Sequence, residues 1–167
     1  LVVDVGIIGL PNAGKSSLLN TLTSARSKVG DFPFTTLEPA LGDFYGLVLA
    51  DIPGLIKGAA KGKGLGHKFL RHIERTKALV HCISSEIDDP LEAYRVVRSE
   101  LELYNKPARP DARLNDTVGQ DSGRSGGDMM KKPEIVVLTK TDIISEEEKD
   151  RKIKILKKAN KNVFAIS

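Results

Sequence analysis

The residues near the start of the chain that are most suggestive of chemistry follow the pattern G-x-x-x-x-G-K-S. Glycines at both ends permit backbone angles that turn successive N–H groups toward an anion. The lysine can reach the β- and γ-phosphate oxygens of a nucleotide, and the serine hydroxyl is a suitable ligand for Mg²⁺. The pattern predicts a phosphate-binding loop, whose residues are Gly9, Leu10, Pro11, Asn12, Ala13, Gly14, Lys15 and Ser16, with Ser17 next.

Two later positions could complete a metal site beside this loop. Residues 28–38 form a polar and aromatic segment, in which Thr35 and Thr36 are the candidates for a hydroxyl ligand. A solvated connection with incidental threonines is the alternative. Asp51 ends an expected strand, where its carboxylate could hold a Mg²⁺-bound water, because Mg²⁺ keeps several of its waters.

Asp51 also opens the sequence D-x-P-G, which is completed by Ile52, Pro53 and Gly54. Gly54 could bring a backbone N–H close to the γ-phosphate because it carries no side chain. Hydrolysis would break that contact, so we expect the glycine- and lysine-rich segment 55–66 to switch between order and disorder. A flexible linker is the alternative.

A third pattern, T-K-x-D, follows the apolar run 134–138. It consists of Thr139, Lys140, Thr141 and Asp142. An aspartate carboxylate can accept two parallel hydrogen bonds from N1–H and the N2 amino group of guanine. Adenine offers no such pair of donors and would leave the carboxylate unpaired, at a cost of about 1–3 kcal/mol. The tetrad is weak evidence alone, but its place after a strand and downstream of the other motifs predicts a guanine site.

The elements that must position these residues can be read from the periodicity of apolar side chains. Strands are expected at 2–8, 40–45, 47–50, 78–84, 134–138 and 163–166, and helices at 15–25, 67–76, 90–104 and 146–160. A strand before the phosphate loop and a helix after it are the context that the motif requires. The order predicts a three-layer α/β domain with a mostly parallel sheet, an antiparallel second strand and the nucleotide at the carboxyl ends of the strands. The lysines of the last helix are interpreted as a solvated face.

Composition favours one soluble globular domain, since the chain has 167 residues, 40% hydrophobic and 29% charged. The net charge of +4 is compatible with an RNA-rich partner but too small to argue for one. No stretch has membrane-spanning length and no targeting peptide opens the chain, so we expect a cytoplasmic protein without a membrane partner. Residues 106–132 have hardly any apolar side chains, which predicts a disordered insertion, with a functional loop as the alternative. Leu1 already lies within the first expected strand, which suggests a piece of a longer chain.

The ordered set of motifs resembles the Ras-like translation-factor class of P-loop GTPases. Within that class the chain is similar to the GTPase (G) domain of the Obg family, also called CgtA. The resemblance covers nearly the whole chain except the insertion and is carried by residues 4–6, 34–39, 50–56 and, most specifically, 64–76. It implies a Ras-like fold and Mg²⁺-dependent hydrolysis of GTP to GDP by a slow switch. It further implies a monomer that works in assembly of the ribosomal large subunit and contacts that subunit or its rRNA.

The resemblance also assigns roles to residues. Residues 9–16 would hold the phosphates, Ser16 and Thr36 the metal, and residues 51–54 would be the second switch. Ser167 would begin the S-A loop that helps to hold guanine. The first switch would consist of Phe34, Thr35, Thr36, Leu37 and Glu38.

The chain departs from common patterns at several positions. Leu55 stands where many GTPases place a glutamine that orients water, a substitution the resembled family shares, and the candidate catalytic residues are Lys15, Thr36, Gly54 and Asn12. Asn12 would either help to bind K⁺, which would act as a fixed arginine finger, or merely shape the loop. Thr139 replaces the usual asparagine, so one contact that ties the base to the phosphate loop is expected to be shorter or lost. The hairpin near residue 46 is shorter than usual and the insertion is longer. Also absent are the glycine-rich amino-terminal domain typical of the family, the rest of the S-A loop and the final helix.

Three other functions fit parts of this pattern. An ATP-using P-loop kinase is disfavoured by Asp142 and the D-x-P-G segment. A non-hydrolysing, GTP-gated docking module is supported by Leu55 and Thr139. Another GTPase with a hydrophobic residue after D-x-P-G, such as the developmentally regulated GTP-binding proteins, is disfavoured by residues 64–76.

Overall fold

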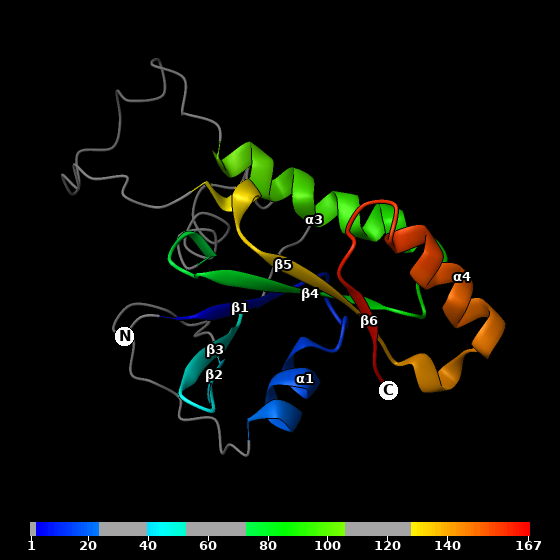
Figure 1. Ribbon diagram of the computed structural model, residues 1–167, viewed down its shortest axis with the longest axis horizontal. Coiled ribbons are helices and arrows are strands. Elements are labelled where there is room, and N and C mark those ends of the chain that lie inside the picture. Colours follow the sequence, from blue (N-terminus) through cyan, green and yellow to red (C-terminus); the bar gives the residue numbers. More distant parts are fainter. Residues whose placement is uncertain (1–2, 24–39, 53–72, 106–127) are drawn as a thin grey trace.

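The computed structural model describes residues 3–23, 40–52, 73–105 and 128–167 (Figure 1). The described part contains one six-stranded sheet in the order β2-β3-β1-β4-β5-β6. All neighbouring strands are parallel except β2 and β3, so the expected mostly parallel sheet with an antiparallel second strand is confirmed. The strands are β1 (Val5–Ile8), β2 (Ala40–Phe44), β3 (Leu47–Asp51), β4 (Ala78–Ser84), β5 (Glu134–Thr139) and β6 (Val163–Ala165).

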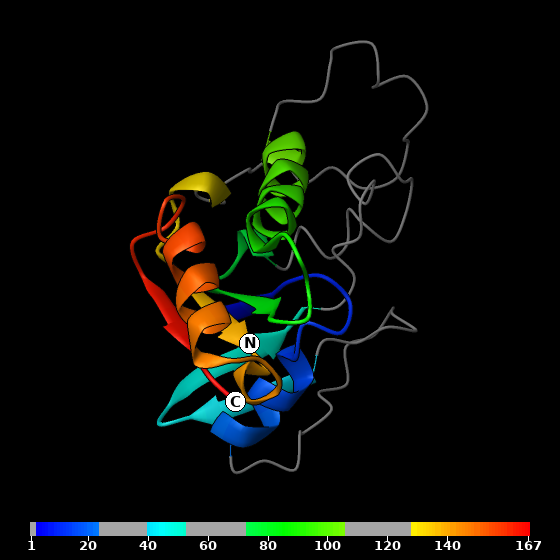
Figure 2. The same ribbon diagram turned by 90° about the vertical axis from the view of Figure 1, so that its right-hand side faces the viewer.

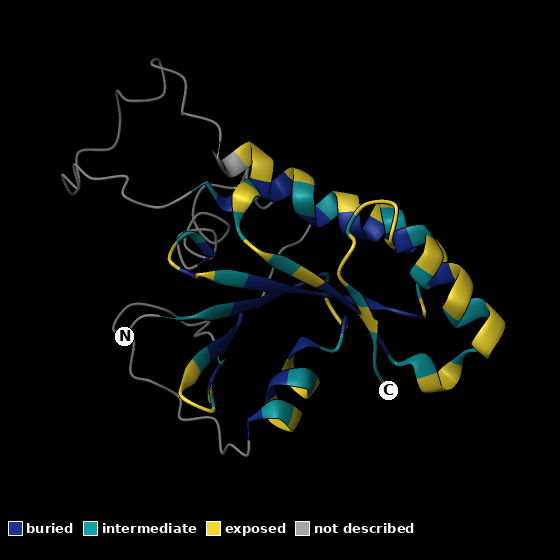
Figure 3. Ribbon diagram, viewed as in Figure 1, coloured by how far each residue is buried: buried dark blue, intermediate teal, exposed yellow. Residues whose placement is uncertain are grey.

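Helices cover both faces of this sheet and make the three expected layers. The helices α3 (Pro90–Asn105) and α4 (Glu146–Leu156) lie on one face, and α1 (Lys15–Leu22) lies on the other (Figures 1 and 2). Two short 3₁₀ turns, η2 (Met129–Lys131) and η3 (Thr141–Ile143), flank β5. The helices turn their buried residues toward the sheet and their exposed residues outward (Figure 3).

The central strands are mostly apolar because successive side chains enter different halves of the core. Ile7 and Cys82 pack with Leu19 of α1 on one face of the sheet. The next residue of each strand points the other way: Ile8 packs with Val97 and Leu101 of α3, and Ile83 packs with Tyr94 of α3 and Leu156 of α4. Apolar side chains of α1, α3 and α4 therefore face the sheet.

Two helices begin with a residue of a type that is preferred at the start of a helix, and in both cases its side chain caps the helix. The Asp89 carboxylate accepts a hydrogen bond from the Glu92 N–H at 2.9 Å, and Pro90 opens α3. The Ser145 hydroxyl accepts a hydrogen bond from the Glu148 N–H at 3.2 Å at the start of α4. Each cap supplies an acceptor for an N–H group that the helix itself leaves unpaired.

The structureless segment expected at 106–132 is wrong at its carboxyl end. Residues 106–127 lie outside the described residues, but 128–132 are folded. Met129 is fully buried and belongs to the same hydrophobic cluster as Ile73 and Leu101. The Asp128 side chain accepts a hydrogen bond from the Met130 N–H, which stabilises the 3₁₀ turn. The segment is further anchored by Arg98, which donates to the Met130 carbonyl, and by Lys132, which donates to the Glu74 and Thr76 carbonyls.

The solvated lysine face expected on the last helix is wrong at Lys152. Its side chain is only 2% exposed. The helix also ends at Leu156 rather than near residue 160, and residues 157–159 form a turn. The other four lysines of the helix and this turn are exposed or partly exposed, as expected. They are Lys149, Lys154, Lys157 and Lys158.

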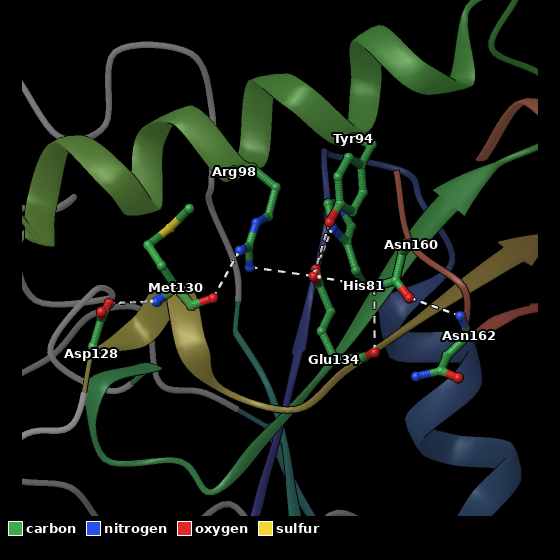
Figure 4. Close-up of polar contacts among 8 residues, drawn as sticks. All are labelled: His81, Tyr94, Arg98, Asp128, Met130, Glu134, Asn160 and Asn162. Atoms are coloured by element: carbon green, nitrogen blue, oxygen red, sulfur yellow. Dashed lines mark hydrogen bonds and ion pairs between the residues drawn. The ribbon is translucent and has the colours of Figure 1, made fainter. Parts of the chain in front are cut away.

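A buried polar cluster lies between α3 and the start of β5 (Figure 4). The Glu134 carboxylate lies 3.0 Å from His81 Nδ1, 3.1 Å from the Tyr94 hydroxyl and 3.3 Å from the Arg98 guanidinium. An ionised carboxylate only accepts hydrogen bonds, so His81 must carry its proton on Nδ1 in this contact. The cluster joins the helix to the sheet at the end of β5 opposite to Thr139. Among the helices that the structure describes, none is long and apolar enough to cross a membrane.

Candidate nucleotide-binding site

Three of the predicted motifs meet at one edge of the sheet. The phosphate loop follows β1, Asp51 ends β3, and the T-K-x-D tetrad begins with Thr139 at the end of β5. These strands are parallel, so their carboxyl ends lie on the same side, which is where ligands bind in sheets of this kind. Motifs that are up to 126 residues apart in sequence are therefore brought into direct contact.

The phosphate loop crosses the end of β4 and reaches β5. At Gly9, where φ is 150°, an added Cβ would collide with the backbone oxygen of Cys82 in β4. At Gly14, where φ is 83°, an added Cβ would lie 3.3 Å from the Thr139 hydroxyl oxygen. Both glycines are therefore required by positive φ and by close approach of the neighbouring strands, in addition to any anion that they face.

Two polar side chains of the loop have defined conformations. Lys15 is buried, and its Nζ donates a hydrogen bond to the Leu10 carbonyl at 3.0 Å. An ammonium has three donors, so two remain for phosphate oxygens. Asn12 adopts a left-handed φ of 62°, a conformation that asparagine tolerates better than most residues. This backbone geometry fits the loop-shaping role of Asn12, and both that role and K⁺ binding stay predictions.

Asp51 and Ser16 fit the binding of a divalent cation. The Ser16 hydroxyl donates a hydrogen bond to Asp51 Oδ2, so the two expected metal-site groups are adjacent. Asp51 is 6% exposed, and its other carboxylate oxygen, Oδ1, is buried without a hydrogen-bond partner among the described residues. A buried, unpaired carboxylate oxygen is costly, and a metal ion or its waters would relieve that cost. Across the described ranges, no group of three or more His, Cys, Asp or Glu side chains could hold a metal ion.

The T-K-x-D tetrad is tied to the phosphate loop through Thr139. Its hydroxyl is buried, donates to the Ala13 carbonyl at 2.9 Å and lies 3.3 Å from the Ile83 carbonyl. A link between tetrad and loop is therefore retained with threonine in place of asparagine. A hydroxyl has one proton to donate, however, so the proton that holds Ala13 is not free for a base.

The end of β6 holds the other side of the tetrad. Thr141 donates to the Ile166 carbonyl from its backbone N–H at 3.1 Å and from its hydroxyl at 3.0 Å. Ser167 follows Ile166 directly, and its role in holding guanine stays a prediction. Asp142 is exposed and, among the described residues, makes no side-chain hydrogen bond or ion pair.

The loop between β4 and α3 also belongs to this site, although the motifs did not indicate it. The Ser85 N–H donates to the Thr139 carbonyl at 3.0 Å, and its hydroxyl donates to the Lys140 carbonyl at 2.6 Å. Glu86 forms an ion pair with Lys140, and this hydrogen bond lowers the pKa of the Glu86 carboxyl. The signal in the sequence was a serine and a glutamate, Ser85 and Glu86, directly after a buried strand, at the edge of the sheet where the tetrad was expected.

Several predicted site residues lie outside the described part of the chain. These are Phe34, Thr35, Thr36, Leu37, Glu38, Pro53 and Gly54. Of the D-x-P-G segment, Asp51 and Ile52 are described, and both are buried. The roles assigned to the first switch and to Gly54 therefore stay predictions.

Comparison with known proteins agrees with this architecture. The sequence pattern of the protein family described as "50S ribosome-binding GTPase" matches residues 4–140. GTPase Obg 2 of Anaplasma marginale is 46% identical over 165 residues, covering 96% of this chain and 44% of the relative. GTPase Obg of Persephonella marina is 46% identical over 162 residues, covering 92% of this chain and 42% of the relative. The chain thus spans less than half the length of these curated relatives.

Solved structures at lower identity share the fold. The G domain of the T. maritima FeoB iron transporter matches with a TM-score of 0.60 at 22% identity, over 98% of this chain and 85% of that one. Era from Aquifex aeolicus bound to GDP and AlF4⁻ matches with a TM-score of 0.63 at 17% identity, over 100% of this chain and 52% of Era. The resemblance to Obg proteins seen in the sequence is confirmed, and the chain belongs to the family of 50S ribosome-binding GTPases.

Proposed function

We propose that this chain is the G domain of a longer protein and that it binds GTP with Mg²⁺ and hydrolyses it slowly to GDP and phosphate. The observation that carries the proposal is the direct contact between the phosphate loop and the T-K-x-D tetrad through Thr139 and Ala13. This contact supports the proposal because it joins the loop that would hold the phosphates to the tetrad whose carboxylate would bind guanine. A single nucleotide could span the two.

At the phosphate end, each side chain has a distinct task. Lys15 would place its remaining two donors on the β- and γ-phosphates, while Ser16 and Asp51 would hold Mg²⁺ and its waters. When bound, Mg²⁺ would neutralise charge that develops on the phosphate oxygens. Thr36 and Gly54 are proposed to complete the γ-phosphate contacts. Asn12 is proposed either to shape the loop, in agreement with its left-handed φ, or in addition to help hold K⁺.

At the base end, the Asp142 carboxylate would accept the two guanine donors, and Ser167 would approach the base from the end of β6. Specificity follows because a base without these donors leaves an acceptor unpaired. The match to Obg relatives supports a role as a nucleotide switch in assembly of the large ribosomal subunit, with that subunit or its rRNA as partner. We further propose that the protein is a monomer and lies in the cytoplasm. We propose these as properties of the whole protein.

The test is single-turnover GTP hydrolysis by this chain with Mg²⁺, in matched KCl and NaCl, and with ATP as competitor. Turnover of GTP that excess ATP does not inhibit is expected, and equal competition by ATP would contradict the guanine assignment. Acceleration in KCl that is lost in Asn12→Ala would support K⁺, whereas equal rates in both salts would leave only the loop-shaping role. Tight GTP binding without turnover would favour the docking module, for which Leu55 is the supporting residue.

A further inference from the structure

One lysine of α4 is buried in a way that a surface helix does not require. Lys152 Nζ donates to the Ser85 carbonyl at 2.6 Å and to the Ile87 carbonyl at 2.9 Å, and it pairs with Glu148 at 3.0 Å. These three contacts use all three donors of the ammonium. Burial of a charge is costly unless it is paired and hydrogen-bonded, and here both conditions are met. Lys152 therefore fixes the backbone of the loop that follows β4.

That loop in turn holds the tetrad. Ser85 lies between the two: its carbonyl accepts from Lys152, its N–H donates to the Thr139 carbonyl, and its hydroxyl donates to the Lys140 carbonyl. Lys140 has a φ of 57°, in the left-handed region that a lysine adopts only when its surroundings hold it there. The hydroxyl of Ser85 supplies such a restraint at the peptide that leads into Thr141 and Asp142.

The direction of Asp142 depends on this peptide. Asp142 is two residues after Lys140, within the same 3₁₀ turn that Lys140 caps. Its own side chain has no partner among the described residues, so the backbone, which sets the position of its Cβ, decides the region that the carboxylate can reach. A rotation of the Lys140 peptide would swing the carboxylate away from the plane of a bound base.

We propose that Lys152 is a positioning residue of the guanine site, which acts through Ser85 on Lys140 and so aims the Asp142 carboxylate. The proposal rests on the proposed function, since it assigns a task to the same base-reading group. The simpler view is that Lys152 only fastens α4 to the domain. That view predicts a loss of stability without a change in base selectivity.

The chain offers a matched control for this difference. Lys132 also donates through Nζ to two backbone carbonyls, those of Glu74 and Thr76. These groups precede β4 and β5, at the edge of the sheet opposite to the tetrad. Since β5 has six residues, the two edges are separated by roughly 17 Å at about 3.3 Å per residue. A variant without Lys132 therefore loses the same kind of buried hydrogen bonds, but at the edge of the sheet away from the tetrad.

The experiment measures the affinities of the 167-residue chain for GDP and for inosine diphosphate, which lacks the N2 amino group that Asp142 would bind. In Lys152→Met and Ser85→Ala we expect GDP affinity to fall about tenfold and the preference for GDP over inosine diphosphate to shrink. Lys132→Met should lose thermal stability but keep the wild-type preference. Ser85→Ala removes one hydroxyl from the chain of contacts and keeps the test decisive if Lys152→Met does not fold.

The outcomes separate the two proposals. A wild-type chain that does not bind GDP would contradict the proposed function itself. A wild-type chain that prefers GDP, with the same preference retained in folded Lys152→Met or in Ser85→Ala, would overturn the positioning role and leave the function intact. An equal loss of preference in Lys132→Met would also overturn it, because general destabilisation would then explain the effect.

Discussion

The contact between Thr139 and Ala13 makes a quantitative prediction about how stability and nucleotide binding are linked. Thr139→Val replaces a buried hydroxyl, 4% exposed as a residue, by a methyl group of similar size. The change removes a hydrogen bond of net value about 1 kcal/mol and leaves the Ala13 carbonyl without this donor, which costs about 1–3 kcal/mol if the carbonyl stays dry.

How this cost is divided depends on the phosphate loop. Without nucleotide the loop can shift and let water reach the Ala13 carbonyl, so the loss in unfolding free energy should stay near the lower limit, about 1 kcal/mol. Bound phosphates would require the loop conformation in which the Ala13 carbonyl is dry. The rest of the free-energy cost of the lost hydrogen bond would then appear as weaker nucleotide binding. We therefore expect GDP affinity to fall about tenfold, the factor that corresponds to about 1.4 kcal/mol.

The assay is urea unfolding with and without GDP, together with direct titration of GDP. Thr139→Ser is the control, because it keeps the hydroxyl and loses one methyl, worth about 0.8 kcal/mol of stability. The serine variant should lose stability but bind GDP as the wild type does. The reasoning would be refuted if Thr139→Val bound GDP within twofold of the wild type, or if both variants lost affinity equally.

Three further changes test other parts of the structure. Asp142→Asn should relax the preference for GTP over ATP, because an amide cannot accept both guanine donors, and unchanged discrimination in a competition titration would contradict this role. Asp51→Asn should remove most of the Mg²⁺ dependence of GTP affinity, since it neutralises the buried carboxylate, and a Mg²⁺ titration as steep as in the wild type would oppose that assignment. Burial alone would raise the pKa of Glu134, but hydrogen bonds and charges from His81 and Arg98 outweigh it and hold the pKa below the ordinary value of 4.5. The stabilisation that the ionised Glu134 provides is therefore complete above pH 4.5 and is lost as the pH falls through the lower pKa of the folded state. The unfolding free energy of Glu134→Gln should fall less steeply in acid, and an unaltered pH profile would show that the cluster does not contribute this stabilisation.

Features of the fold that depend on neighbouring residues in the sequence follow from local geometry. The alternation of Ile7 and Ile8 between the two faces of the sheet follows from β geometry. The caps at Asp89 and Ser145 follow from the unpaired N–H groups at helix starts. The order of strand, phosphate loop and helix places the site without any knowledge of long-range contacts.

The errors have a common physical cause. Lys152 was expected in water because lysine is almost never fully buried unless it is paired, and its partners, the Ser85 and Ile87 carbonyls, are 67 and 65 residues away. The buried pairing of His81 with Glu134 depends in the same way on a contact across 53 residues. Met129 was unexpected because composition averages over a segment and does not see one anchoring side chain. Each case needs a partner whose position only the folded chain reveals.

The tetrad shows how such contacts divide the work at the site. The Thr139 hydroxyl donates to the phosphate loop, and Lys140 pairs with Glu86. The Thr141 hydroxyl donates to the Ile166 carbonyl, directly after β6. Asp142 is the member of the four that the described contacts leave free. Three side chains therefore fix the backbone of the tetrad, so the Cβ from which the Asp142 carboxylate extends is positioned before a base arrives. Selectivity at this site should therefore depend as much on the groups that hold the tetrad, Ala13, Ser85 and Ile166, as on the aspartate itself.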